Sequence, residues 1–448
     1  MSQELFTPVD ELGVDPQRAT VYEHGWQSWS PTGVHRADGT SERPRLGWQH
    51  VMRFRPGAAL PPDGCQGEGL LVVVPGDDEP VRTYAASDAR VDVPSIRAWL
   101  EGDRLVVAAD GPVNVTTSPA GPGGLGRALE DFGEAEHDRS GGHPLRAAPT
   151  VWCSWYHYFL DVTQSDILEN TDEIARLDLP VDVVQVDDGW QAGIGDWQDL
   201  SPRFASMAGL AARIRDTSRR AGIWLAPFVA GDGSVLARDH PDWLVGEAGT
   251  NWGQRLAGLD LTHPGVRDHL GTVLRGLRDL GYDYFKLDFL YAGALPGPRH
   301  LDMTSVQAYR DGLRLVRESV GEETYVVGCG APLLPSVGLV DAMRVAPDTY
   351  NPLVAEVTDS PLRGRAGVEA RAWQQGRLWV NDGDSLVARP AFPLRREWAE
   401  VVEHYSGLRS FSDRVADLDG WGIETVRRQL GSVPPPTPFT QLPDPYVR

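Results

Sequence analysis

Hydrophobic and polar positions follow one pattern in the first third of the chain and another in the rest. Over residues 1–145, short apolar runs such as LLVVVPG and RLVVAADG alternate with Gly- and Pro-rich turn signals. This spacing is typical of antiparallel sandwiches, so we expect an N-terminal β domain of sandwich-like form over 1–145. Its polar, glycine-rich end, SPAGPGGLGRALEDFGEAEHDRSGGHPLRAAP, is expected to be a linker with a short helix in its middle.

From residue 146 onward, apolar runs alternate with amphipathic segments of helical period. The expected strands are VWCSWY, VDVVQV, GIWLAPF, YDYFKLDF, TYVVGC, MRVAPD, LWVND and GLRSFS. The expected helices cover 164–177, 207–220, 264–279, 304–319, 363–375 and 394–404. Eight strands with intervening helices predict an α/β fold, a (β/α)8 TIM barrel over 146–420. After Asp417 one helix-like segment leads into SVPPPTPFTQLPDPY, and we expect residues 421–448 to form an extended C-terminal tail.

Charge and composition narrow the classes of partner. A net charge of −21 disfavours nucleic acid and anionic membranes. No apolar run approaches the length of a membrane span, and the N-terminus has neither the basic start nor the apolar segment of a secretory signal. Three widely spaced cysteines argue for reduced thiols and against a metal cluster. We therefore expect a cytoplasmic protein without metal or cofactor that acts on a small neutral molecule, and a homo-oligomer is left open.

One compositional feature points to a particular residue. Of the 42 basic residues, 41 are arginine and only one is lysine, Lys286. Because arginine has replaced lysine everywhere else, a compact ammonium rather than a planar guanidinium is expected to be required at this position. Chance retention is the plainer alternative, but Lys286 lies two residues before Asp288 in an apolar strand, which favours a functional role.

Polar and aromatic residues end most of the expected barrel strands, at the edge where barrel active sites are built. In strand order they are Trp155, Tyr156, His157, Tyr158, Asp187, Asp188, Trp190, Trp224, Lys286, Asp288, Cys329, Arg344, Asp348, Asp382 and Asp384. Burying so many polar groups for stability alone is costly, so the pattern favours a functional site at the mouth of the barrel. Metal catalysis has little support, because His157 is the only histidine near a strand end and no HxH spacing occurs. No GxSxG elbow supports a serine nucleophile either.

Two carboxylates together with aromatic platforms are the equipment of glycosidases. One carboxylate stabilises the oxocarbenium-like transition state, another group protonates the leaving oxygen, and aromatic faces stack on the sugar ring. A lone tryptophan is more often part of a core. Trp190 and Trp224 lie beside strand ends, however, and are candidates for such stacking.

Six segments taken in order resemble one family of enzymes. They are WCSWYHYFLD, VVQVDDGWQAGIGDW, GIWLAPF, YFKLDFLYAGALPG, GCGAPLLPSVGLVDAMRVAPDT and LWVNDGDS. These residues, from about 150 to 415, resemble the α-galactosidases of glycoside hydrolase family 36, in particular the bacterial, thermophile-type branch. The motif HGWQSWS at 24–30 is similar to the loop through which a β-domain tryptophan of that family reaches the active site.

The resemblance implies a set of roles. Asp288, in the KxD motif, would be the nucleophile of a retaining reaction, and Asp348, in RxxxD, the general acid/base. The other residues that the resemblance places in the galactose subsite are Asp187, Asp188, Trp224, Lys286, Arg344, Tyr158 and either Trp26 or Trp29. We expect Lys286 and Arg344 to hold Asp288 ionised, and Asp348 to be desolvated enough to keep its proton.

Departures from the family pattern leave some properties open. The usual NDPDC motif is replaced by Asn381-Asp382-Gly383-Asp384-Ser385, and the loop after Asp348 is diverged, so the aglycone preference is open. A transferase of the raffinose-synthase type would pass the same covalent intermediate to a sugar hydroxyl. A different sugar, such as N-acetylgalactosamine or β-L-arabinopyranose, would alter the groups near Cys329 and Trp190. A non-catalytic carbohydrate-binding protein is the remote alternative, because both candidate carboxylates are present.

Overall fold

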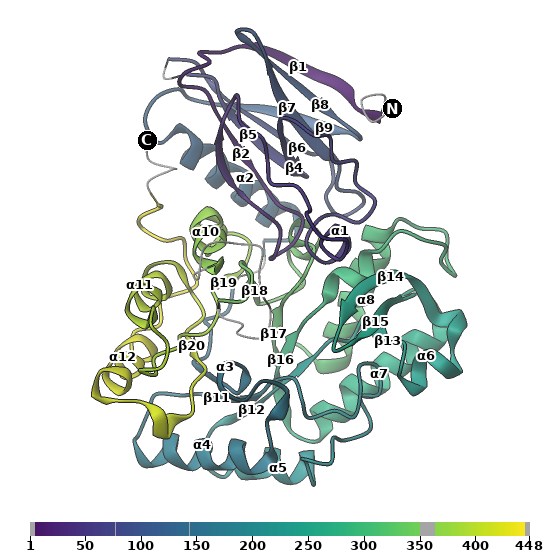
Figure 1. Ribbon diagram of the computed structural model, residues 1–448, viewed down its shortest axis with the longest axis vertical. Coiled ribbons are helices and arrows are strands. Elements are labelled where there is room, and N and C mark those ends of the chain that lie inside the picture. Colours follow the sequence, from purple (N-terminus) through teal and green to yellow (C-terminus); the bar gives the residue numbers. More distant parts are fainter. Residues whose placement is uncertain (1–4, 77, 143, 350–362, 444–448) are drawn as a thin grey trace.

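The computed structural model describes residues 5–76, 78–142, 144–349 and 363–443 of the 448-residue chain. An antiparallel β domain lies over one end of a parallel α/β barrel (Figure 1). Among the described residues, every helix is too short or too polar to cross a bilayer.

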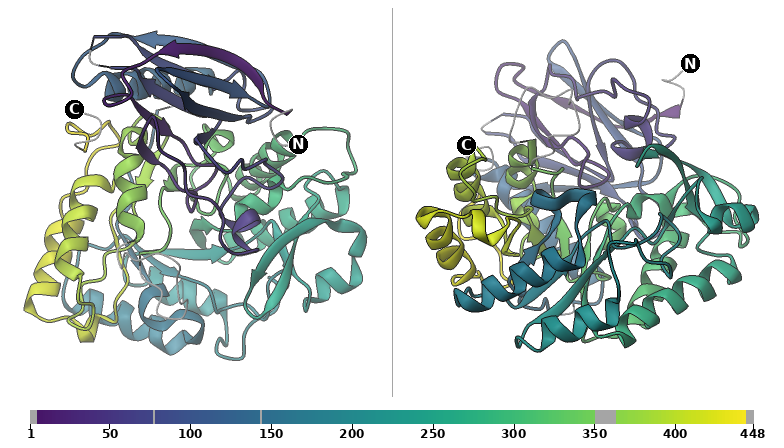
Figure 2. Two further views of the ribbon diagram at one scale, coloured as in Figure 1. Left: turned by 45° about the horizontal axis from the view of Figure 1, so that its top comes forward. Right: turned by 60° about the horizontal axis from the view of Figure 1, so that its bottom comes forward.

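The N-terminal domain consists of two antiparallel sheets, of order β1-β8-β7-β4 and β3-β2-β5-β6-β9. The strands are β1 (Thr7–Gly13), β2 (Thr20–Glu23), β3 (Gly33–Arg36), β4 (Cys65–Glu68), β5 (Leu70–Val74), β6 (Val81–Ala86), β7 (Ser95–Glu101), β8 (Arg104–Ala109) and β9 (Val113–Ser118). A short helix, α1 (Gln49–Met52), precedes β4. The sandwich-like architecture expected from the sequence is confirmed, and Figure 2 shows the two layers from other sides.

Strand β5 explains how the sandwich is joined to the barrel. Its run of apolar residues does not alternate with polar ones, because both faces of the strand are buried. Leu71 and Val73 pack in the core between the two sheets. Leu70 and Val72 belong instead to the large core that continues into the barrel. The outer face of this sheet is therefore a packing surface for the rest of the molecule.

The expected linker is a packed helix. Helix α2 (Gly124–Arg139) has 16 residues and buries Leu125, Leu129 and Phe132 in the same large core. The prediction of a linker with a short helix was wrong in this respect, because the apolar stripe of α2 finds a partner in the outer face of β5. The glycines at 121–126 have the GxGxxG spacing and open α2, but they follow the antiparallel strand β9 rather than a parallel βαβ unit.

The second domain is built around an eight-stranded parallel sheet of order β19-β18-β17-β16-β12-β11-β10-β20. The strands are β10 (Val151–Cys153), β11 (Val183–Val186), β12 (Arg220–Leu225), β16 (Tyr282–Leu287), β17 (Tyr325–Gly328), β18 (Ala342–Arg344), β19 (Val380–Asp382) and β20 (Ser410–Phe411). The amides of Gly407 and Leu408 donate to Asn381 O, and Leu386 forms a bridge with Phe411, so the sheet curls back on itself. The predicted (β/α)8 fold is confirmed.

The helices around this sheet largely match the predicted ranges. They are α3 (Trp155–Tyr158), α4 (Gln164–Arg176), α5 (Met207–Arg215), α7 (Pro264–Asp279), α8 (Ser305–Val320), α9 (Leu333–Ser336), α10 (Arg363–Ala370), α11 (Arg395–Tyr405) and α12 (Gly420–Leu430). Short 3-10 turns are η2 (Phe159–Asp161), η4 (Leu290–Ala294), η5 (Ala372–Gln374) and η6 (Val415–Asp417). Because α12 reaches Leu430, the prediction of an extended tail from residue 421 is wrong for 421–430, and residues 444–448 of the predicted tail lie outside the described residues.

An excursion between β12 and α7 was not predicted. It contains β13 (Val229–Gly231), α6 (Val235–Asp239), η3 (Pro241–Trp243), β14 (Leu244–Asn251) and β15 (Gln254–Leu259). The three strands form a separate antiparallel sheet of order β13-β15-β14. Figure 1 shows this sheet beside the barrel, on the side of α7 and α8.

Alternation along the parallel strands determines which side chains point into the barrel. Val151, Val183 and Tyr284 belong to a small apolar cluster that also contains Tyr325 and Val380. Residues two and four positions further along each strand point the same way, nearer the carboxyl ends. On β16 this rule takes the inward positions from Tyr284 through Lys286 to Asp288. The polar residues found at strand ends are therefore the upper layers of a barrel whose lower layer is apolar.

The seam between the domains is held by a buried arginine. Arg371, between α10 and η5, is fully buried. Its guanidinium donates to the carbonyl oxygens of Gln27 (3.1 Å), Ser28 (3.0 Å) and Ser30 (3.0 Å) in the HGWQSWS loop, and to Val345 O (2.7 Å) after β18. One side chain thus ties the N-terminal loop to the strand end that leads to the predicted acid/base.

Replacing Arg371 by Met should destabilise the protein by at least about 3 kcal/mol, because several buried carbonyls lose charged donors. The free energy of unfolding in urea measures this. Arg365→Met is the matched control, since Arg365 lies on α10 with its side chain 53% exposed in a pair with Glu369, and should change stability by about 0.5 kcal/mol or less. Equal effects of the two changes would contradict the proposed role of the seam.

Candidate active site

Asp288 follows β16 and both of its carboxylate oxygens are held by neutral donors. Trp224 Nε1, from β12, donates to Oδ2 at 3.2 Å, and the amide of Phe289 donates to Oδ1 at 2.7 Å. Phe289 has a φ of 52°, so the chain turns sharply directly after the carboxylate. These two bonds fix the carboxylate plane while leaving lone pairs for another group.

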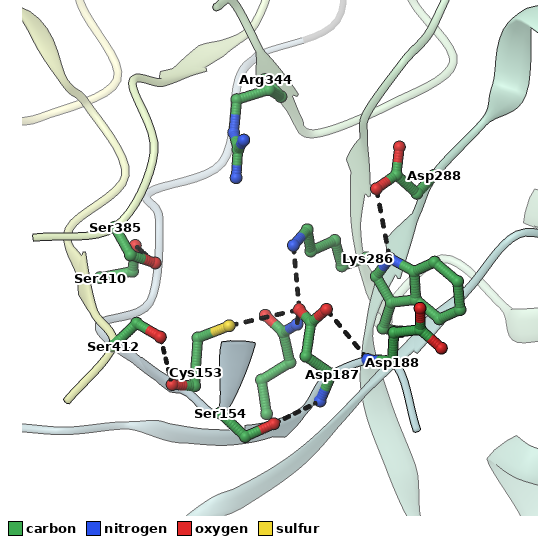
Figure 3. A network of polar contacts seen from close by, with 12 residues as sticks. Cys153, Ser154, Asp187, Asp188, Lys286, Asp288, Arg344, Ser385, Ser410 and Ser412 are labelled. Carbon is green, nitrogen blue, oxygen red and sulfur yellow. Dashed lines mark hydrogen bonds and ion pairs between the residues drawn. The ribbon is translucent and has the colours of Figure 1, made fainter. Parts of the chain in front are cut away.

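The lone lysine is bonded to a different carboxylate from the one expected. Lys286 Nζ lies 2.9 Å from Asp187 Oδ2, and both side chains are buried (Figure 3). Gln185 Nε2 (2.6 Å) and Cys153 Sγ (3.2 Å) donate to the same oxygen. Burial acts to lower the pKa of Lys286, but the Asp187 carboxylate outweighs it and the pKa is raised well above its usual value. Lys286 therefore stays a cation.

Arg344 at the end of β18 is bonded to three carboxylates. Its guanidinium lies 3.1 Å from Asp348 Oδ1, 3.3 Å from Asp382 Oδ2 and 2.5 Å from Asp384 Oδ1. The direct partners of Lys286 and Arg344 are therefore carboxylates other than Asp288, and the expected effect of the two cations on Asp288 stays a prediction. Burial acts to lower the pKa of Arg344, and Asp384 and Asp382 raise it by more.

Asp348 meets the requirement set for a proton donor. Its side chain is 18% exposed, and burial raises its pKa to about 6, against the opposing effect of Arg344. Asp384 and Asp288 raise the pKa further. Asp348 is therefore about half protonated near pH 6, and about a tenth of it keeps the proton at pH 7. The diverged loop noted after Asp348 falls on residues 350–362, outside the described residues.

Asp384 has an unusual backbone conformation. Its φ of 87° lies in a region that favours glycine. The conformation is held by the amides of Thr349, which donates to Oδ2 at 2.8 Å, and Ser385, which donates to Oδ1 at 2.7 Å. Tyr156 OH donates to the same carboxylate. Backbone strain of this kind is found at functional sites, where the surrounding structure holds a side chain in one position. Here it holds the Asp384 carboxylate beside Arg344 and Asp348.

Asp188 is held by two neutral donors. Gln191 Nε2 donates to Oδ1 at 2.6 Å, and Trp252 Nε1, from the turn between β14 and β15, donates to Oδ2 at 2.7 Å. Burial raises the pKa of Asp188 to about 7, and Asp187 and Asp288 add to the rise, while the two hydrogen bonds lower it.

The predicted aromatic residues do not all belong to this group. Trp224 does, through Asp288, and its ring packs edge-on against Trp252. Trp190 is fully buried and donates to Trp224 O at 2.9 Å, so it supports β12 from behind and offers no free face for a sugar. Tyr158 accepts from Asn170 of α4 at 2.6 Å and packs on His157, so its contacts lead away from the carboxylates. Tyr156, two residues earlier, is the tyrosine that reaches them.

The HGWQSWS loop lies against the barrel loop that follows β17. Gln27 forms a bridge with Pro332, and Leu333 N donates to Trp26 O at 2.9 Å. Trp26 is buried at 3% exposure, whereas Trp29 is partly exposed. Of the two tryptophans, Trp29 is therefore the one available to cover a ligand.

The loop after β17 also brings two small residues to Asp288. Cys329 is buried, and burial raises the pKa of its thiol well above the usual value, so it is neutral. A Cβ atom at Gly330 would lie 3.1 Å from Asp288 Oδ1 and 3.1 Å from Phe289 N, and the φ of Gly330 is 51°. Glycine is therefore required here by space and by backbone conformation.

Gln191, Trp252 and Gly330 were missed at the level of sequence. Gln191 and Gly330 sit directly beside the recognised motifs VDDGW and GCGAP. The turn that carries Trp252 gives little signal in the sequence, because Trp-Gly is not one of the dipeptides favoured in two-residue hairpin turns. Among the described residues no group of three or more His, Cys, Asp or Glu side chains is arranged to hold a metal ion.

Comparison with known proteins agrees with this geometry. The sequence profile of the melibiase family matches residues 123–314. The bifunctional α-galactosidase/sucrose kinase AgaSK of Mediterraneibacter gnavus is 31% identical over 165 residues, which are 33% of this chain and 17% of that protein. The chain thus matches less than a third of the length of such curated relatives.

Solved structures give wider coverage. An α-galactosidase from Thermus thermophilus, solved with stachyose and with p-nitrophenyl α-D-galactopyranoside, superposes with a TM-score of 0.76 at 27% identity. The stachyose complex aligns over 95% of this chain and 93% of that one. The family 36 α-galactosidase AgaA of Geobacillus stearothermophilus shares the fold, with a TM-score of 0.62 at 13% identity over 94% of this chain and 61% of that one.

The parallel barrel with buried carboxylates at its mouth is therefore similar in sequence and in fold to glycoside hydrolases. The similarity is to the α-galactosidases of glycoside hydrolase family 36.

Lys286→Arg should lower kcat/KM for p-nitrophenyl α-D-galactopyranoside by about 100-fold although the charge is kept, because a larger guanidinium displaces Asp187 by a fraction of an ångström or more. Arg220→Lys is the control. Arg220 begins the neighbouring strand β12, at the end far from the carboxylates, and pairs with the half-exposed Asp283. A Lys286→Arg enzyme within threefold of wild type would show that lysine survived there by chance.

Proposed function

We propose that the protein is a retaining α-galactosidase in which Asp288 is the nucleophile and Asp348 the general acid/base. The observation that carries this is the contrast between the two aspartates at one barrel mouth. Asp288 is oriented by two neutral N–H donors, whereas Asp348 is buried with its pKa raised to about 6. Two carboxyl groups with different environments are what a retaining glycosidase needs.

The proposed reaction has two steps. Asp288 attacks the anomeric carbon, the glycosidic carbon–oxygen bond breaks, and the Asp348 proton passes to the leaving oxygen. The resulting galactosyl ester of Asp288 is then opened by water, whose proton is taken by the Asp348 carboxylate. Water oxygen bonds to the anomeric carbon as the ester bond breaks. Both aspartates return to their starting states.

Recognition of galactose is assigned to Asp187 and Asp188, which would accept hydrogen bonds from the O4 and O6 hydroxyls. Lys286 can donate to the sugar while it fixes Asp187, and Trp29 would cover the ring from the N-terminal loop. Support comes from the Thermus relative, which binds stachyose and the nitrophenyl galactoside. A fixed carboxylate distinguishes galactose from its epimers, because it cannot accept a hydrogen bond from a hydroxyl that points elsewhere.

Transfer to a sugar acceptor uses the same covalent intermediate and is the second outcome of the same site. Product analysis with and without an acceptor sugar separates hydrolysis from transfer. A panel of nitrophenyl glycosides, including N-acetylgalactosaminide and β-L-arabinopyranoside, tests the choice of sugar. A cytoplasmic location and a homo-oligomer stay predictions. The three cysteines are free and buried, which suits a reducing compartment.

Asp288→Ala should leave the fold intact and lower kcat for a nitrophenyl α-galactoside by at least about 10⁴-fold, because no covalent intermediate can form. Added azide should restore turnover and yield β-galactosyl azide. Asp283→Ala is the matched control, because Asp283 is on the same strand with its side chain 48% exposed. Substantial unassisted activity in Asp288→Ala would remove the nucleophile assignment.

The pH dependence should report the proton on Asp348. A raised pKa of about 6 means that Asp348 is protonated below this pH and loses its proton as the pH rises through it. The ratio of kcat/KM for an unactivated α-galactoside to kcat/KM for α-galactosyl fluoride should therefore fall about tenfold per pH unit above 6, since fluoride needs little protonation. Other titrating groups cancel in the ratio. In Asp348→Asn the ratio should be low and flat, and a ratio independent of pH in the wild type would reject Asp348 as the acid.

A further inference from the structure

The turn between β14 and β15 has tryptophan where a small residue is favoured. Asn251 pairs with Gln254, so Trp252 and Gly253 are the two central residues of a hairpin turn. Their φ angles are 52° and 69°. Two positive values are typical of a type I′ turn, whose first central position favours Asn, Asp or Gly. A bulky residue in this conformation is strained by about 1–3 kcal/mol.

The strained turn brings the Trp252 indole to the carboxylates at the barrel mouth. Trp252 Nε1 donates to Asp188 Oδ2 at 2.7 Å, across 64 residues of sequence. The ring lies 4.8 Å from the Phe289 ring and 6.3 Å from the Trp224 ring, measured between centroids. Phe289 and Trp224 are the two residues whose N–H groups hold Asp288. The hairpin tip therefore contacts both the candidate sugar-binding carboxylate and the surroundings of the candidate nucleophile.

The hydrogen bonds of Asp188 leave it half free. Gln191 takes one lone pair of Oδ1 and Trp252 takes one of Oδ2. Each carboxylate oxygen can accept a second bond, so two acceptor positions remain, and their directions are fixed by the two donors. Without the Trp252 bond, Asp188 would keep only the Gln191 contact and could rotate about its last side-chain bond. A hairpin outside the barrel thus controls a carboxylate inside it.

We propose that Trp252 is a positioning residue of the sugar subsite, which fixes the Asp188 carboxylate so that its free lone pairs meet the sugar hydroxyls. The excursion β13–β15 then has a function, because it is the support that carries Trp252 to Asp188. The inference rests on the proposed function, since it takes Asp188 as a sugar ligand. It also assigns a function to the strained turn at Trp252 and Gly253.

Trp252→Phe keeps an aromatic ring and removes the N–H. We expect KM for a nitrophenyl α-galactoside and Ki for galactose to rise about 10- to 100-fold, the effect of one hydrogen bond to a charged group, with kcat changed less than threefold. A rise in KM with kcat kept indicates loss of binding that is the same in ground and transition states. Trp243→Phe is the control in the same excursion, because Trp243 stacks on His240 and should leave KM unchanged.

The pH dependence of galactose inhibition gives a second readout. Asp187 and Asp288 raise the pKa of Asp188, while Gln191 and Trp252 lower it. Removing the Trp252 N–H should raise this pKa, so the midpoint below which inhibition weakens should move to higher pH in Trp252→Phe. A purely structural role would not move the midpoint.

A double-mutant cycle with Asp188→Asn separates action through Asp188 from other effects. If Trp252 works by fixing this carboxylate, Trp252→Phe should change Ki for galactose less than threefold in the Asp188→Asn background. Equal effects in both backgrounds, or an unchanged Ki and midpoint in Trp252→Phe alone, would overturn the inference. If the wild-type enzyme hydrolyses no α-galactoside and binds no galactose, it is the proposed function that fails.

Discussion

The Arg344 guanidinium holds three carboxylates in one buried group, and the geometry of the barrel mouth depends on it. Buried carboxylates are tolerated only when charge and hydrogen bonds compensate for lost water. Arg344 does this for Asp348, Asp382 and Asp384, and Lys286 does it for Asp187. Asp288 is oriented instead by two N–H dipoles. A carboxylate that is oriented but not tied to a cation suits a nucleophile, because attack does not first require an ion pair to break.

Elements outside the barrel complete this arrangement from two sides. The N-terminal loop is fixed by Arg371, whose fourth acceptor, Val345 O, lies three residues before Asp348. The β14–β15 hairpin reaches Asp188 from the other direction through Trp252. Strand β5, which is buried on both faces, joins the sandwich to the same core. The barrel supplies the charged groups. The N-terminal loop and the β14–β15 hairpin form walls beside them, and the hairpin also donates the hydrogen bond that orients Asp188.

Much of the fold followed from periodicity. The eight strands were found because short apolar runs alternated with amphipathic segments, and the strand ends were found because polar residues interrupt those runs. Pairing was harder to predict. Lys286 lies two residues from Asp288 in sequence, but its partner Asp187 follows β11, which is separated from β16 by β12 in the sheet. The excursion was missed because its strands pair only with one another. The burial of Trp190 could not be predicted, because a buried indole and an exposed one look alike in sequence.

The central claim is that two aspartates with different environments carry out a double displacement. Proton NMR of the anomeric signal during hydrolysis of an α-galactoside tests it most directly. The account predicts that α-galactose appears first and then mutarotates to the equilibrium mixture, because two inversions at the anomeric carbon restore the starting configuration. β-Galactose as the first product would mean that water attacks directly, and would contradict the roles given to both Asp288 and Asp348.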